Sequence, residues 1–307
     1  MKKLTYLILS LFSTVGVAQE LSKDRTYDIV STLASDEMKG REIGTPENEI
    51  AAKYIATLFE ENKLDYCTGT SYFVPFNYKG KTAYNVCGIK KGKSEKLLGF
   101  SGHFDHIGTK KGEGDTIFNG ADDNASGIAT LVGISDYFKD KTPEFSMVFM
   151  AFNGEEKGLL GSQAIANDKN LDNVYKNLTA LFNFEMLATQ SEYGENAVYI
   201  TGDTYSDMKD LFNAQAQNGL MIHGDPYATE QLFYRSDNVS FVKKKIIAHS
   251  ISTVDMNSIK HYHQVNDDID IVNFDNMNKI ISNFAKTVEK LSPKNFSPKY
   301  TEEVNFD

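Results

Sequence analysis

Acidic and imidazole side chains follow several short apolar runs of this sequence, and these residue types in this pattern could bind a metal ion. The candidates are His103, Asp105, Asp122, Asp123, Glu155, Glu156, Glu185 and His263. None of them is a thiol. Imidazoles and carboxylates suit zinc, or another divalent first-row metal, better than they suit a structural thiolate site. The sequence therefore predicts a metal centre of a catalytic type.

Charge counting favours two metal ions over one. We take the ligands to be His103, Asp122, Glu156, Glu185 and His263. Three carboxylates and two divalent ions leave a small positive charge that a bridging hydroxide would neutralise, whereas a single ion would leave a costly negative cluster. Two ions about 3.5–4 Å apart can share one carboxylate. We expect Asp122 to be shared, because Gly120 and Ala121 before it let the backbone approach the ions.

The elements that would carry these residues alternate between short apolar strands and helices. Residues 24–33 and 46–64 have helical patterns, and an antiparallel strand pair is expected around a turn at Lys79-Gly80. Buried strands alternating with helices indicate an open, mostly parallel sheet covered on both faces. We therefore predict an α/β three-layer sandwich with a central mixed, mostly parallel sheet. Ligands of such sheets bind beyond the carboxyl ends of the strands.

The first 18 residues have the pattern of a secretory signal peptide. Lys2 and Lys3 precede an apolar stretch that ends in the small residues Gly16-Val17-Ala18. The stretch is too short and too polar for a membrane span, and no later segment is long and apolar enough to be one. We expect residues 1–18 to be removed on export, to the periplasm or beyond, and residues 19–307 to form a single domain.

Composition narrows the range of partners. The formal net charge is −10 and no basic block is present, which argues against nucleic acid as a partner. The two cysteines are Cys67 and Cys87. Export permits a disulfide between them, but the sequence leaves their pairing open, together with the oligomeric state.

Five segments occur in the order in which they occur in the di-zinc aminopeptidase family, which the sequence resembles. They are "GHFDHIG", "NGADDNASG", "FNGEEKGLLGS", "NFEM" and "YHQVNDD", and the lead-in "LASDEMKGREIGTPENEIAAKYIA" also resembles that of bacterial members. The family's relatives include secreted bacterial aminopeptidases, glutamate carboxypeptidases, glutaminyl cyclases and the catalytically inactive transferrin receptor. The resemblance covers almost all of residues 19–307 and implies one zinc peptidase domain there.

The resemblance also implies a role for each residue. Two Zn²⁺ ions are expected, although a single ion or another divalent metal stays open; one ion would be held by His103, Asp122 and Glu185, and the other by Asp122, Glu156 and His263. Glu155 would be the general base that moves a proton from the attacking water to the leaving amine. Asp105 would hold the second nitrogen of His103. Asp123 would be the second half of a cis peptide unit that follows the bridging aspartate.

Three positions depart from the family pattern or compete within it. The family usually has aspartate where this chain has Glu185, and the extra methylene could move the carboxylate or change the occupancy of that metal. Tyr262 matches a tyrosine that stabilises the oxyanion in some relatives. His261 competes with His263, and we prefer His263 because two aspartates follow it at family spacing. We expect structural roles for the remaining histidines, which are His106, His223 and His249.

We therefore predict an exported zinc-dependent exopeptidase that acts on peptides, in the first place an aminopeptidase. One alternative is a glutaminyl cyclase, which binds one zinc, and the complete two-metal ligand set argues against it. A carboxypeptidase on the same metal centre is a second alternative, which the spacing of the motifs does not decide. A non-catalytic binding protein is a third, and the presence of Glu155 with all five ligand candidates argues against it.

Overall fold

The structure is a computed structural model that describes residues 23–306. The predicted signal peptide, residues 1–18, lies outside the described residues. None of the helices within residues 23–306 has the length and apolar character needed to cross a membrane.

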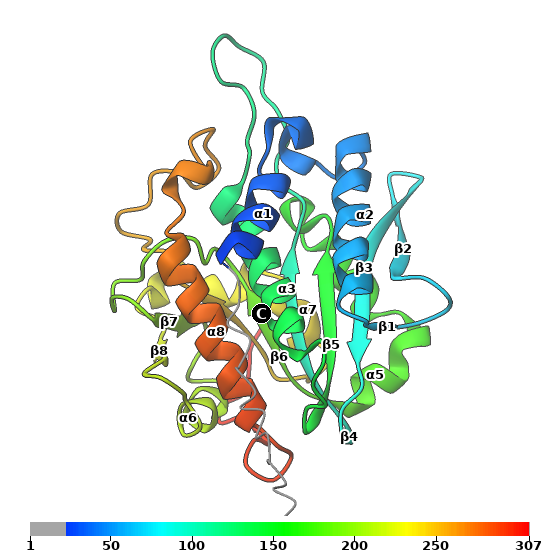
Figure 1. The fold of residues 1–307 in the computed structure, drawn as a ribbon, viewed down its shortest axis with the longest axis vertical. Coiled ribbons are helices and arrows are strands. Elements are labelled where there is room, and N and C mark those ends of the chain that lie inside the picture. The colour runs from blue at the N-terminus through cyan, green and yellow to red at the C-terminus, as the bar shows by residue number, and fades with distance from the viewer. Residues whose placement is uncertain (1–22, 307) are drawn as a thin grey trace, which may run out of the picture.

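A nine-stranded mixed sheet runs through the centre of the molecule (Figure 1). Its order is β1-β3-β5-β4-β6-β9-β7-β8, with β2 also paired to β3. Strands β5, β4, β6 and β9 are parallel, and antiparallel pairs flank them on both sides. The strands are β1 (Asp65–Tyr66), β2 (Phe73–Tyr78), β3 (Lys81–Lys90), β4 (Ser94–His103), β5 (Phe145–Phe152), β6 (Leu178–Phe184), β7 (Ala197–Ile200), β8 (Met221–Gly224) and β9 (Ala248–Ser252).

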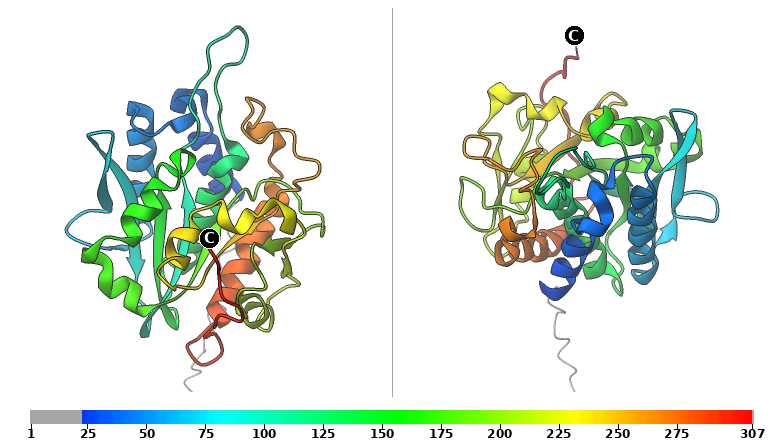
Figure 2. Two further views of the ribbon diagram at one scale, coloured as in Figure 1. Left: turned by 180° about the vertical axis from the view of Figure 1, so that it is seen from behind. Right: turned by 90° about the horizontal axis from the view of Figure 1, so that it is seen from above.

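Helices cover both faces of this sheet, which confirms the predicted α/β fold class. Figure 1 shows the longer helices in front of the sheet, and the reverse view in Figure 2 shows shorter helices on the opposite face. The front helices are α1 (Lys23–Leu33), α2 (Pro46–Glu61), α3 (Gly127–Phe138) and α8 (Phe274–Lys290). The remaining helices are α4 (Leu160–Ala166), α5 (Asp172–Asn177), α6 (Met208–Asn213) and α7 (Asn238–Val242).

Local sequence explains why the main elements form. Helix α2 begins at Pro46, and the Thr45 side chain caps it by accepting a hydrogen bond from the Asn48 N–H at 3.2 Å. Every residue of β5 is buried, as expected for a continuous apolar strand in the middle of a two-sided sheet. The predicted turn between β2 and β3 is present at Lys79 and Gly80, both with positive φ.

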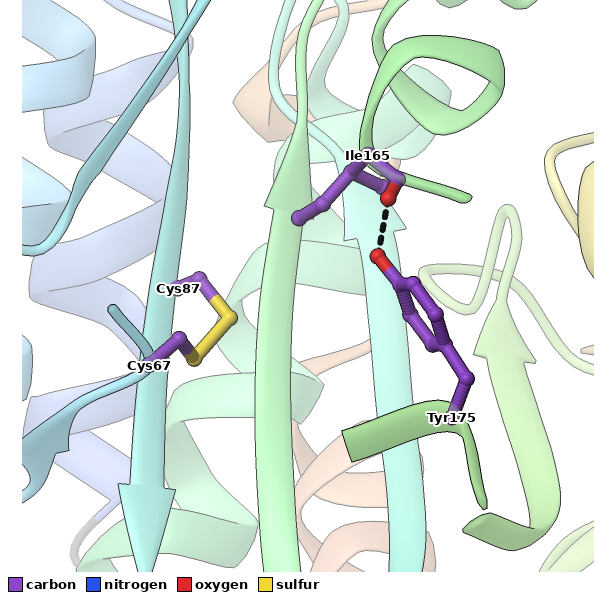
Figure 3. Close-up of a disulfide and its surroundings, with 4 residues drawn as sticks. All are labelled: Cys67, Cys87, Ile165 and Tyr175. Carbon is purple, nitrogen blue, oxygen red and sulfur yellow. Dashed lines mark hydrogen bonds between the residues drawn. A yellow bond between two sulfur atoms is a disulfide. The ribbon is translucent and has the colours of Figure 1, made fainter. Parts of the chain in front are cut away.

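A disulfide joins Cys67, which follows β1, to Cys87 in β3 (Figure 3). This settles the pairing that the sequence left open. On the same face of the sheet, the Tyr175 hydroxyl donates a hydrogen bond to the Ile165 carbonyl and so ties α5 to α4 (Figure 3). Both contacts stabilise the side of the molecule that carries β1 and β2.

The carboxyl ends of the four parallel strands meet at one edge of the sheet. His103 is the last residue of β4, Glu155 follows β5, and Glu185 follows β6. The loop after β9 returns to the same edge and carries Tyr262 and His263. The topology therefore brings the predicted site residues together although they are spread over 160 positions of the chain.

Candidate metal centre and active site

Two clusters of carboxylates and imidazoles share one residue, Asp123. The first contains His103, whose Nε2 lies 3.3 Å from Asp123 Oδ1 and 3.2 Å from Glu185 Oε1. Atoms that ligate one zinc ion at about 2.0–2.2 Å stand at such separations from each other. The donor atoms of these three residues all lie within 4.8 Å of one another.

The second cluster lies on the other carboxylate oxygen of Asp123. His263 Nε2 is 3.4 Å from Asp123 Oδ2 and 3.0 Å from Glu156 Oε2. A further imidazole, that of His106, approaches from the buried side, with Nδ1 at 2.8 Å from Glu156 Oε1 and 3.8 Å from Asp123 Oδ2. The prediction that His106 is only a core histidine missed this contact. Its position three residues after His103 in "GHFDHIG" was the available signal.

Asp122 does not lie between the two clusters, so the expectation that it is the shared ligand is wrong. Its Oδ1 accepts a hydrogen bond from the Ala188 N–H at 2.8 Å, and its Oδ2 lies 2.8 Å from His261 Nε2. The cis peptide bond follows Asp123 and not Asp122. The assignment was shifted by one residue because the sequence does not reveal which of two adjacent side chains faces the strand ends.

The turn that presents Asp123 is held by residues from distant parts of the chain. Both carboxylate oxygens of Asp267 accept main-chain hydrogen bonds, from Asp122 at 2.7 Å and from Asp123 at 3.0 Å. Asn124 bonds the end of β6 through its amide, with Nδ2 donating to the Phe184 carbonyl at 2.8 Å. Its Oδ1 accepts from Met186 N–H at 3.1 Å. These bonds fix the direction of the Asp123 side chain relative to the strand that precedes Glu185.

Asp105 supports the site in a different way from the one predicted. His103 Nδ1 lies 3.1 Å from the Asp105 main-chain oxygen, whereas the Asp105 carboxylate oxygen is 3.7 Å away. The carboxylate instead accepts the main-chain N–H groups of Glu155 at 3.0 Å and Glu156 at 3.3 Å. Asp105 therefore ties the end of β4 to the segment that follows β5.

Glu185 is held by a buried network that the sequence did not reveal. The Ser236 hydroxyl donates to Glu185 Oε2 at 2.6 Å and accepts from Asn183 Nδ2 at 2.8 Å. Asn183 Oδ1 in turn accepts from the Ser101 hydroxyl at 2.8 Å. Glu185 Oε1 remains directed at His103. The longer glutamate side chain thus fits at this position because Ser236 fixes its second oxygen.

A pocket opens beside the first cluster, and both Glu155 and Tyr262 lie on its wall. The Tyr262 ring stacks on the His263 imidazole with ring centroids 4.0 Å apart. One part of the wall is apolar and is formed by Met186, Tyr199, Leu232, Val254 and Met256. The remaining lining residues outside the two clusters are polar or charged: Thr201, Arg235, Ser236, Ser250 and Ser252. The pocket can therefore accept a side chain while a peptide bond lies against Glu155.

The electrostatics of the site reflect an excess of buried carboxylates. Burial and the neighbouring acids raise the pKa of Glu155 well above its usual value. Burial by itself would lower the pKa of His103, but the carboxylates of Glu185 and Glu155 hold this pKa well above its usual range. Hydrogen bonds to the second cluster's two carboxylates raise the pKa of His263 to about 10. A site with these properties attracts cations, whether protons or metal ions.

The donor set fits divalent metal ions. Imidazole and carboxylate atoms from different elements converge at ligand–ligand distances, and the clusters share a carboxylate as a dinuclear centre does. Buried carboxylates are costly unless they are paired or coordinate metals. The residues present are therefore suited to zinc, with the imidazoles of His103 and His263 on opposite sides of Asp123.

The other histidines lie elsewhere. His223 stacks on Tyr193 with ring centroids 4.0 Å apart, and His249 is a buried residue of β9 with hydrogen bonds to Ser206 and Thr201. His261, which competed with His263 in the sequence, pairs with Asp122 and belongs to neither cluster. The loop that carries His263 is thereby attached to the turn that carries Asp123.

An open α/β sheet whose strand ends bring imidazole and carboxylate clusters to one pocket is the architecture of a metallohydrolase. Residues 85–288 match the model of peptidase family M28, and the chain belongs to this family of metallopeptidases. This membership confirms the resemblance drawn from the five sequence motifs.

Curated relatives and solved structures agree with this assignment. A probable zinc metalloprotease of Pyrenophora teres f. teres (strain 0-1) is 36% identical over 190 residues, covering 59% of this chain and 40% of the relative. Aminopeptidase YwaD of Bacillus subtilis (strain 168) is 28% identical over 133 residues, covering 42% and 27%. The chain spans less than half the length of the curated relatives it matches.

A solved glutaminyl cyclase of Bacteroides thetaiotaomicron, bound to N-acetylhistamine, has the same fold. Its TM-score is 0.70 at 16% identity, over 90% of this chain and 100% of that chain. At this identity the likeness concerns the fold alone. Peptidases and a cyclase therefore share this architecture, so the reaction has to be argued from the site.

Proposed function

We propose that this protein is an exported zinc-dependent exopeptidase that removes N-terminal residues from peptides. The observation that carries the proposal is the sharing of Asp123 by two imidazole–carboxylate clusters, with Glu155 on the wall of the adjoining pocket. A two-metal set of this kind is suited to hydrolysis, whereas a cyclase with one zinc needs only half of it.

Two Zn²⁺ ions are proposed, with Asp123 in the role first given to Asp122. His103, Asp123 and Glu185 would hold one ion, and Asp123, Glu156 and His263 the other. Bound zinc supplies Lewis acidity at the site. The same donor set could hold other divalent metals, and metal analysis of the purified protein decides the identity and number of ions.

The protein's own residues would carry the proton and stabilise the developing charge. The Glu155 carboxylate would accept a proton from the attacking water and donate it to the leaving amine nitrogen. The Tyr262 hydroxyl would donate a hydrogen bond to the carbonyl oxygen as it becomes negative. Asp105 would hold Glu155 in place through its main-chain N–H. The apolar wall formed by Met186 and its neighbours would bind an apolar side chain.

A free amino terminus suits this pocket better than a free carboxyl terminus. The pocket wall carries Glu155, which would bind no metal ion and whose carboxylate would attract a cationic amine and repel a carboxylate. Arg235 is the lining cation on which a carboxypeptidase would depend. The carboxypeptidase and glutaminyl cyclase alternatives therefore remain outcomes that the experiment below separates.

Export is proposed from the residue pattern of positions 1–18 and is supported by the disulfide between Cys67 and Cys87, because disulfides persist in oxidising compartments. We also propose that residues 19–307 form one zinc peptidase domain, since strands from Asp65 to Ser252 belong to one sheet.

The test is a mass-spectrometric time course of the purified protein, zinc-loaded or treated with a chelator. The peptide mixture would contain members with free N-termini, N-acetylated members, C-amidated members and members that begin with glutamine. Stepwise loss of apolar residues from free N-termini, stopped by acetylation and by the chelator, is expected. Loss of ammonia from glutamine-initiated peptides alone would establish a cyclase, and trimming that C-amidation blocks would establish a carboxypeptidase. No change with zinc bound would contradict an exopeptidase acting on these peptides.

A further inference from the structure

The lead-in segment "KGREIGT" carries a buried arginine that the proposed function does not explain. Arg41 is completely buried, at the end of the 3₁₀ segment Asp36–Arg41. Arginine is almost never fully buried unless its charge and donors are satisfied. Its surroundings therefore indicate what it does.

The Arg41 guanidinium donates four hydrogen bonds, all to main-chain carbonyls. Nε donates to Phe104 O at 2.7 Å, and Nη2 donates to Gly120 O at 3.0 Å. Nη1 donates to Asn119 O at 2.6 Å and to Leu33 O. A planar fork with five N–H donors is the side chain that can reach several fixed acceptors at once.

These carbonyls belong to the segments that carry the proposed zinc ligands. Phe104 directly follows His103 at the end of β4. Gly120 precedes the turn Ala121–Ser126, which contains Asp123. Leu33 is the last residue of α1. One side chain therefore connects the strand end with His103, the turn with Asp123 and helix α1, which packs against that turn.

The charge of Arg41 also faces the site. Burial lowers its pKa to about 10, so the guanidinium stays protonated at neutral pH. The acids that act on it most strongly are Asp267, Asp123 and Asp105. Since the four hydrogen bonds of its guanidinium all go to carbonyls, these carboxylates remain free for their own partners. A direct ion pair would instead have drawn one of them away from the clusters.

We propose that Arg41 is a positioning residue of the metal centre, which sets the distance between His103 and the shared carboxylate of Asp123. The inference rests on the proposed zinc site. It assigns to the lead-in motif a role in metal binding that its place in the sequence, 62 positions before His103, does not reveal.

The test compares Arg41→Lys with Asn62→Ala in the full chain. Lysine keeps the charge but cannot reach all the carbonyls. Asn62 is a matched control: it is also fully buried and joins α2 to Ser135, roughly two turns into α3. The zinc Kd would be measured by competition with a chromophoric chelator, well below the unfolding temperature, and the Tm of the metal-free protein in parallel.

Arg41→Lys is expected to raise the zinc Kd about tenfold or more, the range found for outer partners of metal ligands. Asn62→Ala is expected to lower the Tm and leave the Kd unchanged. Arg41→Lys with a lower Tm and the wild-type Kd would overturn the proposal, because Arg41 would then be structural only. Arg41→Met, which also removes the charge, should bind zinc more weakly too. Tighter binding by that variant would mean that Arg41 merely repels the ions, and would also overturn the proposal.

The wild-type protein separates this inference from the proposed function. If it binds no zinc, the proposed zinc site itself fails. If it binds zinc and the Arg41 variants bind it equally well, only the role of Arg41 fails.

Discussion

Asp122 and Asp123 are adjacent in the chain, but their carboxylates face different partners. Asp123 lies between His103 and His263, whereas Asp122 bonds the Ala188 N–H and His261. The Asp123 carboxylate is placed to bind metal, and the Asp122 carboxylate attaches the turn to its neighbours. This division is the basis for the first two predictions.

Asp123→Asn should remove most bound zinc, because both clusters lose a charged ligand. Asp122→Asn should keep the full zinc content, since its side chain contacts protein groups only. Inductively coupled plasma mass spectrometry of the two purified variants measures this directly. Equal zinc loss in Asp122→Asn would restore Asp122 as the shared ligand.

His263→Ala should lower the zinc content, whereas His261→Ala should not. Loss of the His261 imidazole leaves a buried oxygen of Asp122 without this partner, which should cost about 1–3 kcal/mol of unfolding free energy. Chemical denaturation and metal analysis of both variants test the two effects together. A drop in zinc content for His261→Ala alone would exchange the roles of the two histidines.

Glu155→Gln should keep its zinc and lose turnover by about 10²–10⁴-fold, because only the proton transfer is removed. Glu156→Gln is the matched neighbour and should lose zinc, since Glu156 contacts His263 in the second cluster. Steady-state rates on a peptide, together with metal analysis, distinguish the two. Zinc loss in Glu155→Gln would contradict the division of roles between these residues.

Removing the Cys67–Cys87 disulfide should lower the unfolding free energy by about 3 kcal/mol, given its separation of 20 positions. The bridge joins the residue after β1 to β3, outside the parallel strands that carry the site, so zinc content should not change. The double variant Cys67→Ala with Cys87→Ala would be compared with wild type in urea, and metal analysed in both. Loss of zinc from the folded variant would show that this edge of the sheet does position the site.

His249 should make stability fall on acidification. Its Nδ1 donates to Thr201 O at 2.8 Å, its Nε2 lies 2.7 Å from the Ser206 hydroxyl, and the Phe233 ring packs against it. Burial lowers its pKa to about 4, with Asp203 the acid that partly opposes this. In the unfolded chain the imidazole has a pKa of about 6.5 and becomes protonated below that pH, whereas in the folded protein it stays neutral until the pH approaches 4.

The contribution of His249 is therefore complete above about pH 6.5 and is lost as the pH falls toward 4. Between pH 7 and pH 5 the loss should be about 2 kcal/mol. Metal-free wild type and His249→Gln would be denatured in urea at both pH values. If the unfolding free energies of the two proteins depended equally on pH, the pKa of His249 would not be lowered in the folded state.

The sequence by itself determined the architecture and the chemical type of the site. Apolar runs such as 145–152, alternating with helical patterns, specify buried strands covered on both sides. Because parallel strands end at one edge, acids and imidazoles that follow such runs must meet there. His103, Glu156 and Glu185 could be placed in this way, because His103 ends its strand, Glu185 directly follows its strand and Glu156 lies a few residues beyond the end of its strand. The short strands β7 and β8, of four residues each, gave no comparable pattern.

The tertiary structure decided which neighbouring side chain faces the site. Asp123 is turned toward the clusters because Asp267, 144 positions away, accepts its main-chain N–H, while Asp122 is held by Ala188 and His261. Local sequence cannot specify such long-range partners, because adjacent residues in an irregular turn have no fixed periodicity. The contacts of His106, Ser236 and Arg41 were hidden for the same reason: each depends on a partner brought close only by the folded sheet.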